Sequence, residues 1–169
     1  MLQLLRRMFK HRWLDESDAR RAIPAEMAER LRARVAASES RHSGEIRIYI
    51  EAGLPLSYLW RKATARERAV AMFGRLRVWD TQDNNGVLIY LLLAERAIEL
   101  VADRGLNQCV APAEWQAMVS RMGAAFTEGR YEDGLTQAIA EVSALLVQNY
   151  PSRPGQANVN ELPDAPVIT

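Results

Sequence analysis

Residues 85–103 decide the fold, and they read NGVLIYLLLAERAIELVAD. The Asn-Gly pair at the start of this stretch is a strong turn signal. The continuously apolar run over residues 87–93 predicts a strand that is covered on both faces and lies in the centre of its sheet. A tight reversal over residues 94–96 leads into a second strand over 97–103, so the two segments predict an antiparallel hairpin.

The segment before this hairpin predicts how the sheet continues. Residues 45–51 alternate apolar and polar side chains, which predicts a strand with one face in the core. One long helix, predicted over residues 59–77, connects this strand to the hairpin. The first two strands should therefore be parallel, with a right-handed crossover between them. Further amphipathic helices are predicted over residues 24–40, 113–128 and 132–150.

These elements predict an α/β fold, in which a sheet is covered by amphipathic helices. Its small mixed sheet should have a central apolar strand, one parallel crossover and one antiparallel hairpin. The 169 residues suit a single domain of this kind. We assign residues 23–150 to the domain, residues 1–22 to an N-terminal basic amphipathic helix with its connection, and residues 151–169 to an extended or disordered tail.

The N-terminal helix, predicted over residues 1–13, is amphipathic. Leu, Met, Phe and Trp side chains cover one side of it, and Arg, Lys and His side chains cover most of the other. A basic amphipathic helix can lie on a membrane surface, so peripheral membrane contact through residues 1–14 is one interpretation. We favour the other interpretation, in which the helix docks on the domain or on a second copy of it.

Composition narrows the class of partner and the compartment. The formal net charge of +1 provides no overall field for nucleic acid, so we expect no nucleic-acid partner. The single cysteine, Cys109, excludes an intramolecular disulfide and fits a reducing compartment. No apolar run is long enough to cross a bilayer, and the N-terminus lacks the features of a signal peptide. These observations predict a cytoplasmic protein.

The predicted topology brings three short segments to one edge of the sheet: the start of the first strand, the start of the second and the end of the third. Carboxylate and amide oxygens gather there, and such oxygens suit calcium or magnesium. The alternative is that these side chains cap turns and pair with arginine. The candidate metal ligands are Glu45, Asp80, Asp83 and Asp103, and the candidate ligand-binding residues are Ser43, Asn85 and Arg104.

Other chemical motifs are absent from the sequence. There is no glycine-rich phosphate-binding loop and no zinc-ligand spacing of Cys and His. The segment 80–86 contains the residue types of a calcium loop but does not fit the helix–loop–helix motif. His42 directly precedes Ser43, which is a poor arrangement for a base and its nucleophile.

Several segments together resemble the TPM domain family. They are SGEIR at 43–47, NGVLIYL at 85–91, VADRG at 101–105 and FTEGRYEDGL at 126–135. The resemblance covers roughly residues 36–150. It implies an α/β/α sandwich. It also implies several functions known among members, which include acid phosphatase activity and photosystem II repair in plant thylakoids, calcium binding, and accessory roles in membrane complexes.

Carried over to this sequence, the resemblance implies an acidic pocket formed by Glu45, Asp80 or Asp83, and Asp103. The chain differs from the commoner pattern at Asn84, where short members often carry Arg. Our leading hypothesis is a TPM-type module that binds a divalent cation or a protein partner at this edge, with Glu45, Asp83 and Asp103 as ligands.

Two other functions remain open. One is a weak metal-assisted acid phosphatase, in which a cation polarises the phosphoryl group and Arg104 stabilises its oxygens. The other is a structural interaction domain that uses the N-terminal amphipathic helix.

Overall fold

The computed structural model describes residues 2–152 and 159–169, and the side chains of residues 6–152 and 159–169. In this part of the chain a mixed four-stranded sheet has the order β3-β2-β1-β4. The strands are β1 (Ile46–Glu51), β2 (Val87–Leu92), β3 (Ala97–Ala102) and β4 (Val167–Ile168). The helices are α1 (Leu2–Arg12), α2 (Glu16–Ala22), α3 (Ala25–Glu39), α4 (Leu56–Trp60), α5 (Ala65–Arg75), η1 (Leu93–Glu95), α6 (Arg104–Cys109), α7 (Pro112–Thr127) and α8 (Tyr131–Asn149).

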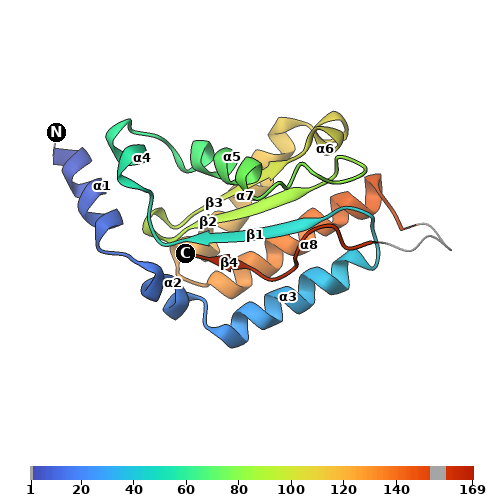
Figure 1. Cartoon of the computed structure of the whole chain (residues 1–169), viewed down its shortest axis with the longest axis horizontal. Helices are drawn as coiled ribbons and strands as arrows, with labels where there is room; N and C mark the ends of the chain where they lie inside the picture. Colours follow the sequence, from blue (N-terminus) through green and yellow to red (C-terminus); the bar gives the residue numbers. More distant parts are fainter. Residues whose placement is uncertain (1, 153–158) are drawn as a thin grey trace.

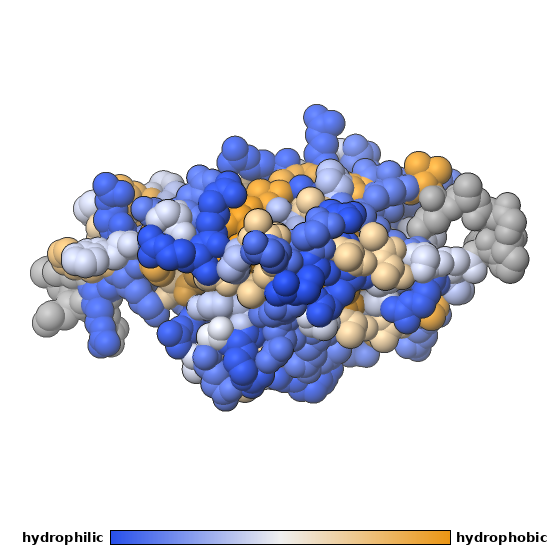
Figure 2. Space-filling model, turned by 90° about the horizontal axis from the view of Figure 1, so that it is seen from below, coloured by the Kyte–Doolittle hydropathy of each residue, from blue (hydrophilic) through white to orange (hydrophobic). Residues whose placement is uncertain are grey.

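Helices cover both faces of the sheet, which gives the predicted α/β/α sandwich (Figure 1). On one face, α2, α3, α7 and α8 pack against alternate residues of the strands, among them Ile48 and Ile89. On the other face, α4 and α5 pack against the residues between, among them Leu88 and Tyr90. The outer surface seen from below is mostly hydrophilic, with hydrophobic residues showing between the charged ones (Figure 2).

The predicted pairing of the strands is confirmed. β1 and β2 are parallel, with Ile46 opposite Val87, and the crossover between them contains α4 and α5. β2 and β3 form the antiparallel hairpin, with Val87 opposite Ala102. Every residue of β2 is buried, as its continuous apolar run predicts.

The prediction that β1 has only one face in the core is wrong, because all of its residues are buried. The alternating polar residues lie in a second buried layer. Glu51 accepts hydrogen bonds from Arg68 of α5, and Arg47 donates to the carbonyls of Pro163 and Ala165. An alternating pattern therefore marks a polar buried layer here, and not a solvent-facing one.

The single long helix predicted over residues 59–77 is also wrong. The chain breaks between α4 and α5 at Lys62, whose φ of 56° lies in the left-handed region. Thr64 then caps α5: its side chain accepts from the Glu67 backbone N–H, and the Glu67 carboxylate accepts from the Thr64 backbone N–H. This capping box starts a new helix.

The predicted tail is extended but is not separate from the domain, and residues 153–158 of it lie outside the described residues. Its last part forms β4, which pairs in parallel with β1, Tyr49 lying opposite Val167. Leu162 is buried in the core beneath α5. At the other end, Ala19 of α2 packs in the opposite core, so part of the predicted N-terminal connection also belongs to the domain's interior.

Helix α1 lies against the domain close to α4 (Figure 1). It contacts the domain through Arg7, which donates to Glu95 at 2.7 Å, through Met8, which packs against the core, and through His11, which is buried. Among the described residues, no helix is both long enough and apolar enough to pass through a membrane.

Candidate cation site at the sheet edge

The three predicted segments do meet at one edge of the sheet. The Asp103 backbone N–H donates to the Gly86 carbonyl at 2.9 Å, and the Gly105 N–H donates to the Asn84 carbonyl at 3.0 Å. The Val87 N–H donates to the Glu45 carbonyl at 2.8 Å. These bonds extend the sheet ladder beyond the strand ends and hold the loops together.

The loop before β2 has a defined shape. The Asn85 backbone N–H donates to the Thr81 hydroxyl at 3.1 Å, which closes the turn. Asn84 has a φ of 52°, a left-handed conformation that Asn tolerates better than most residues. Gly86 has no room for a side chain, since a Cβ there would lie 2.0 Å from the Val78 carbonyl oxygen.

Ser43 joins two of the predicted site residues. Its hydroxyl donates to the Asp83 carboxylate at 3.4 Å and accepts from the Asn85 side-chain Nδ2 at 3.3 Å. The amide nitrogen of Asn85 therefore faces the Ser43 hydroxyl. Asn85 is 1% exposed, and its Oδ1 is buried without a hydrogen-bond partner in the described part of the chain.

The carboxylate of Asp103 provides a second buried oxygen that lacks a hydrogen-bond partner among the described residues. As the N-cap of α6 it accepts the Arg104 backbone N–H at 2.7 Å through Oδ1. Its Oδ2 is buried and has no hydrogen-bond partner within residues 2–152 and 159–169. Arg104 does not neutralise it, since the Arg104 Nε donates to the Asn84 side chain at 3.0 Å.

Tyr150, at the end of α8, is a member of this site that the sequence analysis missed. Burial raises the pKa of Tyr150, and the charges of Cys109, Asp83 and Asp103 raise it further. A Cβ on Gly105 would come within 2.5 Å of the Tyr150 hydroxyl. The Tyr150 hydroxyl therefore lies beside Gly105, in the first turn of α6. No local sequence motif indicates that Tyr150 belongs to this site, because only the path of α8 across the sheet brings it here.

Glu45 and Asp80, two of the four predicted metal ligands, have different surroundings from Asp83 and Asp103. Glu45 accepts from the backbone N–H groups of Glu161 and Leu162, each at 3.2 Å, and burial raises its pKa. Asp80 is exposed on the loop. Among the described residues, no three His, Cys, Asp or Glu side chains are grouped so that they could hold a metal ion. A metal site with all four of these carboxylates as ligands stays a prediction. The geometry favours a site with fewer carboxylate ligands.

Acid–base chemistry by His42 has no support in this geometry. The ring is buried, and its Nδ1 donates to the Gly44 carbonyl at 2.9 Å. Burial lowers the pKa of His42 to about 4, so the ring is neutral at pH 7. A neutral ring bonded to the backbone cannot serve Ser43 as a base through that nitrogen.

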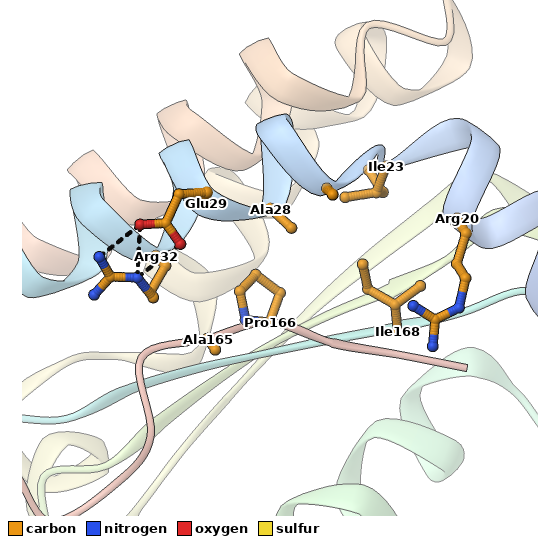
Figure 3. A pocket seen from close by; sticks show the side chains of 9 residues that line it. Arg20, Ile23, Ala28, Glu29, Arg32, Ala165, Pro166 and Ile168 are labelled. Carbon is orange, nitrogen blue, oxygen red and sulfur yellow. Dashed lines mark hydrogen bonds and ion pairs between the residues drawn. The ribbon is translucent and has the colours of Figure 1, made fainter.

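A pocket of about 390 Å³ lies far from these residues, between α2, α3 and the tail (Figure 3). Ile23, Pro166 and Ile168 form much of its lining, with Arg20 and Arg32 at its sides. Both arginines already bind glutamates of their own helices, Glu16 and Glu29. Among its lining residues no cation faces it unpaired, and none is a predicted site residue.

The molecule is thus a small α/β/α domain with a polar, partly unsatisfied site at one edge of its sheet. The family model of the TPM domain matches residues 17–145. The chain therefore belongs to the TPM domain family.

Two solved structures are similar to it. One is the BA42 protein of the psychrophilic bacterium Bizionia argentinensis, with 24% identity and a TM-score of 0.74, covering 86% of this chain and 94% of that one. The other is the N-terminal domain of a protein from P. gingivalis, with 18% identity and a TM-score of 0.61, covering 76% of this chain and 81% of that one. At these identities the likeness shows the fold alone. No curated protein matches the chain.

Proposed function

We propose that the chain is a cation-binding module that takes a divalent cation at the edge formed by Ser43, Asp83, Asn85 and Asp103. One observation carries the proposal: Asn85 Oδ1 and Asp103 Oδ2 are both buried at this edge without a hydrogen-bond partner among the residues that the structure describes. A buried oxygen without a partner is costly, and such oxygens are few in folded proteins. A cation between them would satisfy both.

The residue types favour calcium over magnesium. Calcium accepts amide, hydroxyl and carboxylate oxygens in irregular geometry, whereas magnesium demands a near-ideal octahedron and keeps much of its water. In this proposal Asp103 and Asn85 supply direct ligands. Asp83 adds the second negative charge, and Ser43 orients Asp83 and Asn85 through the hydrogen bonds described above.

Glu45 has a different role in this proposal from the one expected of it. Its two carboxylate oxygens hold the tail backbone at Glu161 and Leu162, so it positions the tail and does not bind the cation. Asn85 replaces it as a ligand.

We also place the protein in the cytoplasm, where Cys109, which forms no disulfide, would stay reduced.

Calorimetric titration with calcium, and separately with magnesium, tests the proposal. Asp103→Asn keeps an N-cap for α6, because Asn caps helices as well as Asp, but removes the charge and replaces Oδ2 by a nitrogen. We expect this variant to bind calcium at least about tenfold more weakly than the wild type, since even supporting residues of metal sites cost that much.

Asp80→Asn is the matched control, because it makes the same chemical change in an exposed side chain of the neighbouring loop. It should bind calcium as the wild type does. Equal loss of affinity in both variants would indicate a general charge effect, and absence of binding in the wild type would refute the site.

A weak metal-assisted phosphatase is the second candidate, and the position of Arg104 favours it. Its guanidinium is exposed, and its Nε donates to the side chain of Asn84, which lies in the same loop as Asp83 and Asn85. The terminal nitrogens could stabilise phosphoryl oxygens beside a bound cation. Phosphate release that requires calcium or magnesium, and that Asp103→Asn abolishes, would identify this activity.

A further inference from the structure

Helix α1 and the residue after it expose two aromatic side chains to solvent. The residues that contact the domain are Arg7, Met8 and His11. The described residues that point away include Phe9, which is 63% exposed, and Trp13, which directly follows the helix and is 80% exposed. An amphipathic helix that served only to cover the domain would bury these aromatic rings.

Specific polar contacts fix this orientation. Arg7 donates from Nε to Glu95 at 2.7 Å and from Nη2 to the Ala63 carbonyl at 2.7 Å. The Leu54 backbone N–H donates to His11 Nδ1 at 2.9 Å, so the other ring nitrogen of His11 carries the proton that is donated to Glu95 at 3.0 Å. A Cβ on Gly53 would lie 2.6 Å from the His11 carbonyl oxygen, so the helix and this loop are in close contact.

The outward face also carries positive charge. Arg6, Lys10 and Arg12 are exposed between the aromatic residues, and α1 contains no acidic residue. None of these three cations forms an ion pair with another residue in the described part of the chain. The adjacent α4, at the same end of the molecule (Figure 1), adds two exposed apolar side chains, Leu56 at 51% and Trp60 at 68%.

We propose that this outward face of α1, formed by Arg6, Phe9, Lys10, Arg12 and Trp13, binds the surface of an anionic lipid bilayer. Tryptophan and phenylalanine insert at the boundary between headgroups and acyl chains, while Lys and Arg approach the anionic headgroups. A second copy of the chain would bring the same positive face, and like charges would oppose that pairing. The binding is peripheral and is independent of the cation site.

Co-sedimentation with vesicles tests this inference. The wild type should bind vesicles made of phosphatidylglycerol and phosphatidylcholine in roughly equal parts, and bind pure phosphatidylcholine vesicles far more weakly. The double variant Phe9→Ser/Trp13→Ser should lose at least about tenfold in affinity, because it removes both aromatic anchors. Lys10→Gln/Arg12→Gln should lose about fivefold for each charge, and added salt should mimic this loss.

Trp79→Ser is the matched control, since Trp79 is 49% exposed on the loop after α5. It should bind the anionic vesicles as the wild type does. The emission of Trp13 should shift to the blue on binding, as seen by the difference between the wild type and Trp13→Ser. The proposal fails if the wild type does not bind anionic vesicles, if the double variant binds equally well, or if the wild type is a dimer that ignores vesicles and dissociates in the double variant.

Discussion

Two buried carboxylates, Glu51 and Asp103, have opposite surroundings. Glu51 is 6% exposed and Asp103 8% exposed. Glu51 accepts hydrogen bonds from Arg68 Nε at 2.9 Å and from the Tyr90 hydroxyl at 2.7 Å, and forms an ion pair with the Arg68 guanidinium. Asp103 accepts the Arg104 backbone N–H, and its other carboxylate oxygen is buried without a hydrogen-bond partner among the described residues.

The difference teaches that burial of a charge does not by itself mark a functional site. Glu51 lies within β1, where α5 supplies a cation across the sheet face. Asp103 lies just beyond β3, where loops meet and Arg104 binds Asn84 instead. A satisfied buried charge serves the fold, whereas an unsatisfied one retains the capacity to bind a ligand.

The largest expected effect comes from breaking the satisfied site. Arg68→Ala leaves Glu51 buried without its cation and removes the contact of Arg68 with the Tyr58 ring. We expect the free energy of unfolding to fall by about 3–5 kcal/mol, as for other buried pairs that lose one partner. Denaturant unfolding measures this change.

Arg130→Ala is the control for this substitution. Arg130 pairs with Glu128 and Asp133 on the surface, where ion pairs contribute about 0–1 kcal/mol. If the two substitutions cost the same, the Arg68–Glu51 pair does not carry the stability that this comparison assigns to it.

A third buried carboxylate, Glu39, extends the comparison of Glu51 with Asp103, because it should make the stability of the fold depend on pH. Burial, followed by the charges of Glu45 and Asp164, raises the pKa of Glu39 from its ordinary 4.5 to about 8, against a backbone hydrogen bond from Ile46 that lowers it. The folded protein then holds a proton that the unfolded chain releases near pH 4.5. This stabilisation is complete below pH 4.5 and is lost as the pH rises to about 8.

Unfolding measured between pH 6.5 and 8 isolates this effect, because the pKa of His42 shifts from 6.5 to about 4 and affects stability mainly below that range. The wild type should become less stable as the pH rises, and Glu39→Gln should flatten the curve. Glu29→Gln, an exposed carboxylate on the same helix paired with Arg32, should leave the slope in place. A slope that persists in Glu39→Gln would assign it to another group.

The fold could be predicted where the signal was local or topological. The apolar run of β2, the hairpin and the crossover to β1 were all correct. The break between α4 and α5 also had a signal, the Thr64-x-x-Glu67 capping box, which we did not weigh against the helical pattern. The docking of β4 on β1 had no local sequence signal. It depends on Glu45 and Arg47, which bind backbone groups more than a hundred residues away in the sequence.

The strand topology was enough to predict which loop residues meet at the candidate cation site, but not how each side chain is oriented there. Topology brought Ser43, Asp83, Asn85 and Asp103 to one edge. It could not place Glu45, whose strand face is covered by a tail that the sequence analysis treated as separate. Nor could periodicity show which side of α1 faces the domain, since polar contacts through Arg7 and His11 decide it.

The smallest expected change is also the most direct test of the claim that unpaired buried oxygens mark the functional site. It is denaturant unfolding of the wild type and Asp103→Asn, each with and without calcium. Calcium at ten times its dissociation constant should stabilise the wild type by about 1.4 kcal/mol and Asp103→Asn, which binds at least about tenfold more weakly, by about 0.4 kcal/mol or less. Equal stabilisation of both proteins, or of neither, would contradict the account.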